Sequence, residues 1–240
     1  MFALGSCNSY ISLKKKYRDI YVNFGYEWSL KEFGSLWVLD QINQTGAKRV
    51  AEFGPGFNTF FSAQMHKIGV EYWCIDRSDS NAGIGSNRDR YLKTVETRSS
   101  RNQRTVEAFL GDNSHELPSG YFDIVFSISV VEHIDAEPME ACVKDAMRIL
   151  TPSGQLTNSI DTYFGSRKHQ EWHNACLNGG LAVSQPHHTD WSFNGNRTTF
   201  LERQDIRYQL YNGLTKDNMW QKDVPYVTQF ATVLHAAGKA

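Results

Sequence analysis

The sequence predicts an α/β domain built on a doubly wound, mostly parallel sheet. Three observations support this fold class. Short apolar runs alternate with segments of helical periodicity along much of the chain. One run, residues 49–53, breaks into a glycine-rich turn at residues 54–59, and the next run ends in Asp76. Because ligands bind at the C-terminal ends of the strands in such sheets, we expect the functional site at this edge.

The composition limits the classes of protein to which the chain can belong. The 240 residues suffice for one well-buried domain but not for two full ones. Hydrophobic residues make up 40%, charged residues 21%, and the formal net charge is -1, which disfavours disorder and a nucleic-acid surface. No apolar run approaches the ~20 residues of a membrane helix, and the four cysteines form no C-x-x-C pair. We therefore expect a cytoplasmic protein that acts on neither membranes nor nucleic acids.

The glycine-rich turn is the strongest local signal. Glu52 breaks the apolar run just before it, and Gly54, Pro55 and Gly56 follow. The two glycines allow a sharp turn and let a ligand approach the backbone amides. Asn58, which tolerates the left-handed region, stands where a third glycine is often found. The helix expected next would point its N-terminus at that ligand. A turn that serves geometry alone is the alternative.

Two stretches precede this strand. Residues 1–23 contain the basic run Lys14 to Lys16 and are typical of a solvated helix face or a mobile arm. From Ser29 apolar residues recur at helical spacing, and Glu32 completes a capping-box pattern. Gly46 is placed to end this helix, which we expect to pack on the domain.

Asp76 ends the second strand, residues 70–75, close to the ~20-residue offset at which an acidic residue binds ribose hydroxyls. A carboxylate there offers acceptors to both hydroxyls. An exposed aspartate that opens a loop is the alternative. The basic stretch from Arg77 to Arg104 is interpreted as a loop and a solvated helix, rather than as an anion-binding lid.

The later elements complete the alternation. We expect a third strand at residues 106–110, a central strand at 124–126, a helix at 139–150 and a fifth strand at 155–161. The loops between them begin at residues 111–113, 127–129 and 151–154.

Residues from about 50 to 161 resemble the class I S-adenosylmethionine-dependent methyltransferases of the small-molecule branch. Five motifs match in order, namely Glu52 to Gly56, Asp76, Gly111-Asp112, Phe122 to Val125 running into Val131-Glu132-His133, and residues 148–154. The departures are Asn58 and Ser153, where many members have glycine, and Thr151, where lysine is common.

This resemblance implies S-adenosylmethionine as the cofactor and a Rossmann-like sheet of seven strands with an antiparallel last strand. It divides the single domain into a helical segment (1–45), a cofactor-binding core (46–161), a substrate insertion (162–225) and the last strand (226–240). The residues it places around the cofactor are Glu52, Gly54, Pro55, Gly56 and Asn58 at the turn, Asp76 with Arg77 at the ribose, Asp112 with Asn113 at the adenine, and Ser127 with Ser129 at the methyl group.

The expected reaction is methyl transfer to an oxygen or nitrogen atom of a small molecule. If the acceptor is a hydroxyl, His133 is the candidate general base, with a packing role as its alternative. Three other functions are alternatives. A nicotinamide dehydrogenase would more often have glycine at Thr59, and a nucleic-acid base methyltransferase would have an amide-donor motif where Ser127 to Val130 stand. A protein that binds the cofactor without transferring methyl stays open.

Residues 162–223 are the least predictable. His169 and His173 flank Glu171 at helical spacing, and His187-His188 follow, but no third metal ligand stands at a recognisable distance. We therefore assign no metal site. The oligomeric state is left open, a homo-oligomer included.

Overall fold

The computed structural model describes residues 2–4, 7–20, 30–77, 88–162, 168–183 and 231–239. The strands are β1 (Phe2–Leu4), β2 (Arg49–Phe53), β3 (Glu71–Asp76), β4 (Arg104–Glu107), β5 (Phe122–Ile128), β6 (Leu150–Thr162), β7 (Leu181–Val183) and β8 (Ala231–Lys239). The helices are α1 (Cys7–Lys16), α2 (Leu30–Thr45), α3 (Phe60–Ile68), α4 (Arg88–Ser99), the 3-10 turn η2 (Val131–His133), α5 (Ala136–Ile149) and α6 (Lys168–Asn178).

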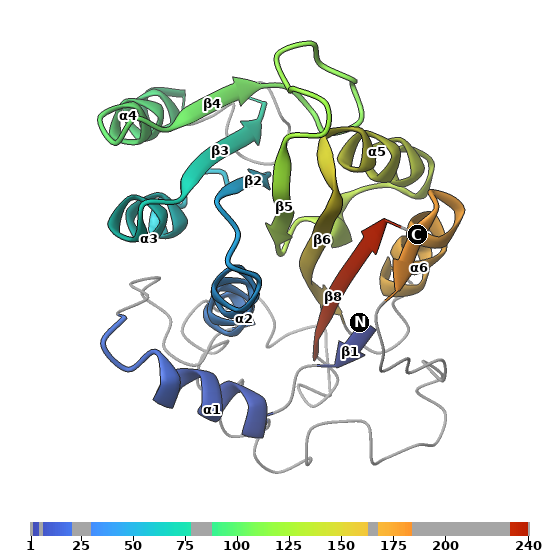
Figure 1. Cartoon of the computed structure of the whole chain (residues 1–240), viewed down its shortest axis with the longest axis horizontal. Coiled ribbons are helices and arrows are strands. Elements are labelled where there is room, and N and C mark those ends of the chain that lie inside the picture. The colour runs from blue at the N-terminus through green and yellow to red at the C-terminus, as the bar shows by residue number, and fades with distance from the viewer. Residues whose placement is uncertain are drawn as a thin grey trace, which may run out of the picture.

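One sheet organises these elements (Figure 1), in the order β1-β8-β6-β5-β2-β3-β4. The strands from β6 to β4 pair in parallel, and β8 runs antiparallel to β6, which confirms the predicted fold class and its antiparallel last strand. Strand β2 lies between β3 and β5, so the chain reverses its winding there, and the glycine-rich turn follows β2 directly. This is the position at which ligands bind in open α/β sheets.

The edge of the sheet beyond β8 is shared by two short strands. Strand β1 pairs with residues 233–235 of β8 and β7 with residues 237–239, both antiparallel to β8. The eight strands of the described residues therefore fill seven positions. A run of three residues is too short to show a period, which is why β1 was not separated from the expected helical segment.

Alternate residues of the strands enter two cores on opposite faces of the sheet. Val50 lies in the core formed with α1, α2 and α3, whereas Ala51 lies in the core formed with α5 and α6. Burial on both faces explains why the central strands are continuous apolar runs. Tyr10 and Leu13 of α1 belong to the first core, so this part of the N-terminal segment is docked rather than a mobile arm.

Several boundaries differ from prediction. Strand β4 spans residues 104–107, because polar side chains are tolerated on an edge strand, and the Ala108 amide donates the last hydrogen bond to β3, at the Asp76 carbonyl oxygen. Helix α5 begins three residues early, since Pro138 is allowed in a first turn. Strand β6 begins at Leu150 and absorbs the expected loop at 151–154 as a shift in register against β5.

No helix among the described residues is long and apolar enough to cross a membrane. Ser29 and residues 184–230, with His187 and His188 among them, lie outside the described residues, so the predictions for them stay predictions.

Candidate functional site

The glycine-rich turn is shaped by two left-handed residues. Gly54 has φ +67° and Gly56 has φ +53°, and the Gly54 amide donates to the Ile75 carbonyl oxygen at 2.9 Å, which ties the turn to β3. A Cβ on Gly54 would lie 2.8 Å from Val130 Cγ1, so the loop after β5 packs directly on this glycine. A Cβ on Gly56 would meet no described atom within 4 Å. In the direction of an added Cβ, the turn is therefore closed at Gly54 and open at Gly56, where a ligand has room to approach.

Asp76 links the end of β3 to this turn. Its Oδ2 accepts a hydrogen bond from the Gly56 amide at 2.8 Å, and its Oδ1 accepts one from the Arg77 amide at 2.9 Å. Burial raises the pKa of the Asp76 carboxyl, and the two amides and Arg98 partly offset that rise. A carboxylate has about four acceptor positions, so two remain for a ligand. The Arg77 side chain itself is exposed.

Arg98 of α4 is a site residue that the sequence reading missed. It is fully buried, and its Nη2 donates to the carbonyl oxygens of Gly56 at 2.9 Å and Asn58 at 3.0 Å. Its charge also lowers the pKa of Glu52 and of Asp76. The stretch around it was interpreted as a solvated helix, but its buried residues, Tyr91, Thr94 and Arg98, recur at helical spacing. This periodicity is the sequence signal for a buried helix face, but it is hard to recognise because the buried residues are polar.

Glu52 and Asn58 both contribute to holding the turn in place. Glu52 is buried, and the Tyr72 hydroxyl donates a hydrogen bond to its carboxylate. Burial raises the Glu52 pKa to about 7, although Tyr72 and Arg98 act in the opposite direction. Asn58 Oδ1 accepts from the Phe60 amide at 2.8 Å, which fixes the first residue of α3. Pro55 is buried, and its carbonyl oxygen accepts from the Asn58 amide at 3.0 Å.

The loop after β4 carries Asp112 and Asn113, both exposed. Asp112 Oδ2 accepts from the Phe109 amide at 3.1 Å, and Asn113 has a left-handed backbone with φ +52°. The Gly111 amide donates to Asp145 Oδ2 at 2.8 Å, which fastens the loop to α5. Both predicted adenine residues thus lie on an anchored, solvent-facing turn.

The two serines after the central strand have different environments. Ser127 lies inside β5, fully buried, and its hydroxyl donates to Asn158 Oδ1 of β6 at 2.8 Å. Ser129 lies beyond the strand with φ +52°, and its amide donates to the Ser159 carbonyl oxygen at 2.9 Å. Ser127 therefore joins β5 to β6, whereas Ser129 lies in the loop after β5, next to Val130, which packs on Gly54.

The predicted base, His133, faces outward. Its side chain is 75% exposed, and its Nε2 lies 4.0 Å from Glu132 Oε1. Partial burial and the charges of Lys31 and Lys168 lower its pKa. The neighbouring Glu132 side chain is only 13% exposed. The turn η2 thus directs the glutamate inward and the histidine toward solvent.

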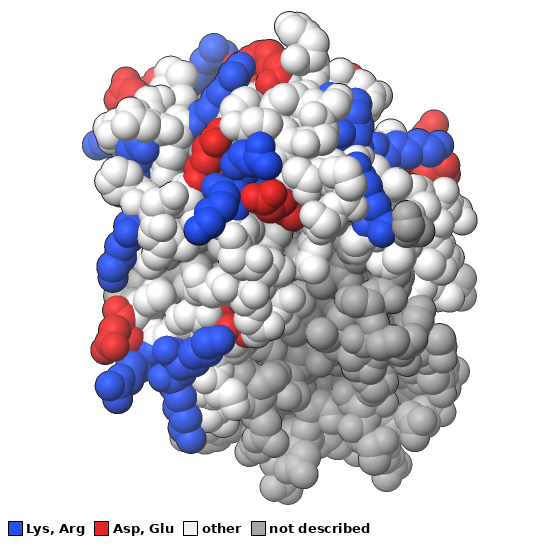
Figure 2. Space-filling view, in the orientation of Figure 1, with Lys and Arg blue, Asp and Glu red and all other residues white. Residues whose placement is uncertain are grey.

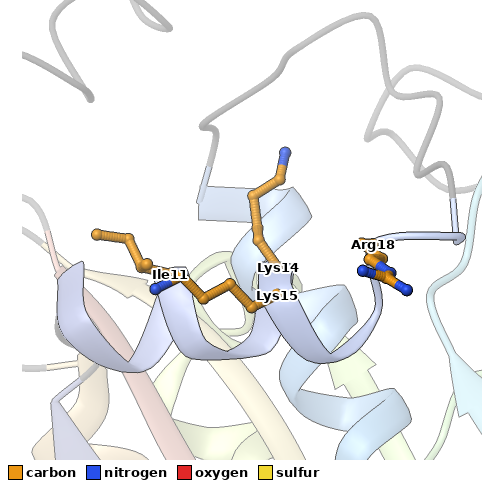
Figure 3. A pocket seen from close by; sticks show the side chains of 4 residues that line it. All are labelled: Ile11, Lys14, Lys15 and Arg18. Atoms are coloured by element: carbon orange, nitrogen blue, oxygen red, sulfur yellow. The ribbon is translucent and has the colours of Figure 1, made fainter.

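Two features lie apart from this site. His169 is buried with a pKa lowered to about 4, chiefly by burial, and within the described residues no three metal-ligating side chains come together. A pocket of about 380 Å³ on α1 is lined by Ile11, Lys14, Lys15 and Arg18 (Figure 3), none of which belongs to the turn. Figure 2 shows acidic and basic side chains interspersed across the described part of one face.

The comparisons with known proteins agree with this geometry. Residues 51–157 match a family described as "Methyltransferase domain". This part of the chain has the features of a class I methyltransferase domain. The matched span runs from β2 through most of β6 and includes the turn, Asp76 and Ser129. The cofactor of this class of methyltransferases is S-adenosylmethionine.

Solved structures share the methyltransferase fold at low sequence identity. A TehB-like SAM-dependent methyltransferase from Corynebacterium glutamicum is 10% identical, with 97% of this chain and 98% of that chain covered and a TM-score of 0.51. A putative sarcosine dimethylglycine methyltransferase from Galdieria sulphuraria is also 10% identical, covering 85% and 83%, with a TM-score of 0.52. The [4+2]-cyclase SpnF is 13% identical, covering 85% and 80%, with a TM-score of 0.53. Comparison with curated proteins gives no match.

Proposed function

We propose that this chain transfers the methyl group of S-adenosylmethionine to an oxygen or nitrogen atom of a small molecule in the cytoplasm. The observation that carries the proposal is the link between Asp76 and the Gly56 amide at the point where the sheet reverses its winding. It holds an acidic acceptor beside an open, left-handed turn, which suits a ligand that has both hydroxyl donors and a positive charge.

The described residues fit this cofactor. The open side of Gly56 leaves room for it, and the free acceptor positions of Asp76 suit ribose hydroxyls. We assign Asp112 and Asn113 to the adenine and Ser129 to the methyl end. When bound, S-adenosylmethionine supplies an activated methyl group and its own leaving group. The protein then mainly orients the two reactants, which accounts for about 7–11 kcal/mol of the barrier in well-positioned reactions.

Proton removal from the acceptor is the remaining task. His133 is the base that the motif suggests for a hydroxyl acceptor, and its lowered pKa keeps the imidazole neutral near pH 7, as a base must be. Its exposure means that an acceptor would have to cover it. A His133→Ala variant should then lose turnover while its cofactor affinity stays unchanged.

A second candidate is a protein that binds S-adenosylmethionine without transferring methyl. One fold neighbour, SpnF, is described as a [4+2]-cyclase, so the fold does not by itself require methylation. The two candidates differ only in whether an acceptor becomes labelled.

Two measurements test the proposal. Calorimetric titration of the full chain with S-adenosylmethionine and, separately, with NAD should give binding of the first only. Incubation with methyl-labelled cofactor and pools of hydroxylated and amino compounds should then give a labelled product. Binding without label across the pools would favour the non-methylating protein, and binding of NAD alone would reject both candidates.

A further inference from the structure

Two carboxyl groups meet near the C-terminal ends of β5 and β6. Glu132 lies in η2, two residues after Val130, whose side chain packs on Gly54. Asp161 is the penultimate residue of β6. The Asp161 backbone amide is turned toward the Glu132 carboxyl, and the charges of the two groups repel each other. The pair is thus joined to the glycine-rich turn through Val130, next to the place where the reactive methyl group is expected.

Polar atoms around this pair lack hydrogen-bond partners. Glu132 Oε2 and Asp161 Oδ1 are shielded from solvent and have no partner within the described residues. The Ser129 residue is only 9% exposed, and its hydroxyl is turned toward Asp161 without a hydrogen bond of normal geometry. Buried polar atoms are seldom left unpaired, so these three point to a missing ligand that donates hydrogen bonds. The strained backbone of Ser129, with φ +52°, is typical of ligand-binding positions.

The charges in this region favour a cation. Burial raises the pKa of both carboxyl groups, and the nearby charge of Asp161 raises that of Glu132 further. Because the two groups repel each other when both are ionised, the pair binds a proton tightly, and a cation beside them would relieve that repulsion. Lys31 of α2 lowers both pKa values, but it is exposed, and its charge is correspondingly screened. His133 lies beside Glu132 on the solvent side.

We propose that Glu132, Asp161 and Ser129 select a basic amine as the methyl acceptor, an assignment that rests on the methyl-transfer function proposed above. A protonated amine brings a positive charge and up to three N–H donors, which matches two carboxyls and a hydroxyl. An alcohol brings one donor and no charge, and would leave buried acceptors unpaired.

The chemistry of such an acceptor balances. Binding of the cation drives the proton of Glu132 into solvent, and Glu132 then accepts a proton from the ammonium nitrogen, while Asp161 stays ionised and holds that nitrogen. The nitrogen lone pair forms the new N–C bond as the S–C bond of the cofactor breaks, and the electron pair of that bond stays on sulfur. The methylated amine leaves with the positive charge, together with neutral S-adenosylhomocysteine.

The test measures transfer of labelled methyl from S-adenosylmethionine by the full chain. The acceptors are small primary and secondary amines, each paired with the alcohol of the same carbon skeleton. Glu132→Gln and Asp161→Asn remove one ionisable carboxyl group each at nearly constant size, and Glu137→Gln, an exposed residue of α5, is the matched control. Calorimetry reports the cofactor affinity of every variant.

We expect label in the amines only, at rates reduced about 100-fold in Glu132→Gln, as for loss of a general base. Asp161→Asn should chiefly raise the KM for the amine, and the control should match the wild type. Cofactor affinity should be unchanged throughout. Label in the alcohols, or in neither series by a chain that binds the cofactor, overturns the amine assignment. A wild-type chain that fails to bind S-adenosylmethionine overturns the proposed function itself.

Discussion

The two acidic regions of the site differ in how their carboxyl groups are satisfied. Asp76, on the cofactor side, accepts hydrogen bonds from two backbone amides and lies near the charge of buried Arg98. On the acceptor side, Glu132 and Asp161 repel each other and keep unpaired buried oxygens. The cofactor side is therefore organised before its ligand arrives, whereas the acceptor side depends on a ligand to complete its hydrogen bonds.

Replacing Arg98 should remove this difference between the two sides. It should also lower the free energy of unfolding more than any of the substitutions that follow. Arg98→Met leaves the carbonyl oxygens of Gly56 and Asn58 unpaired and removes the cation nearest to Glu52 and Asp76. We expect a loss of about 3–5 kcal/mol in the free energy of unfolding, measured by urea denaturation. Lys93→Met, on an exposed position of the same helix, is the control. Equal stability of the two variants would mean that Arg98 only fills space.

Gly54 is the residue of the glycine-rich turn that packs against Val130. Gly54→Ala and Gly46→Ala place a side chain on nearly the same left-handed backbone, but only Gly54 has Val130 at 2.8 Å. The Gly54 variant should lose about 1–3 kcal/mol more in unfolding free energy than the Gly46 variant, owing to overpacking. It should also bind S-adenosylmethionine more weakly. The double variant Gly54→Ala, Val130→Ala should recover part of both losses, and no recovery would place the clash elsewhere.

Substitution of Asp76 tests the cofactor side of the site directly. Asp76→Ala removes the acceptor of the Gly56 amide and the charged partner proposed for the ribose. We expect cofactor binding to weaken by about 1–3 kcal/mol in calorimetry, as for loss of charge-assisted hydrogen bonds. Asp112→Ala, on an exposed turn, should cost less. An unchanged affinity for Asp76→Ala would place the cofactor elsewhere.

Substitution of Glu52 should have the smallest effect, a change in how the free energy of unfolding depends on pH. Its folded-state pKa is raised from 4.5 to about 7, chiefly by burial, so the native state holds its proton more tightly than the unfolded chain. Its contribution is therefore present below about pH 4.5 and is lost as the pH rises through 7. Glu52→Gln should make the decline in unfolding free energy between pH 5 and 8 shallower by about 1–2 kcal/mol.

Urea midpoints at several pH values would check the Glu52 prediction. Glu96→Gln, at an exposed position on α4, should leave the slope unchanged. A Glu52→Gln slope identical to that of the wild type would show that the carboxyl is ionised at all these pH values.

The same contrast explains what the sequence could predict. The position of Asp76 at the end of β3 is predictable, because a strand end and its offset from Gly54 are local features of the chain. The position of Arg98 is not, because a polar buried face has the same composition as a solvated one, and the carbonyl oxygens that Arg98 binds lie 40 or more residues away. Whether Glu132 or His133 points inward depends on one 3-10 turn, η2. This turn has three residues, too few for the sequence to show a helical period. The roles of the predicted cofactor residues and of His133 stay predictions.

The shared sheet edge has a consequence for how the protein is made. Phe2 of β1 pairs with His235 of β8, so β1 has to wait for the synthesis of a segment more than 200 residues later before it can find its partner. Until β8 arrives, β6 also presents an unpaired edge. Such long-range pairing slows folding and exposes the nascent chain to aggregation. Synthesis in cells should therefore leave this half of the sheet dependent on chaperones, while the strands from β2 to β5 assemble early.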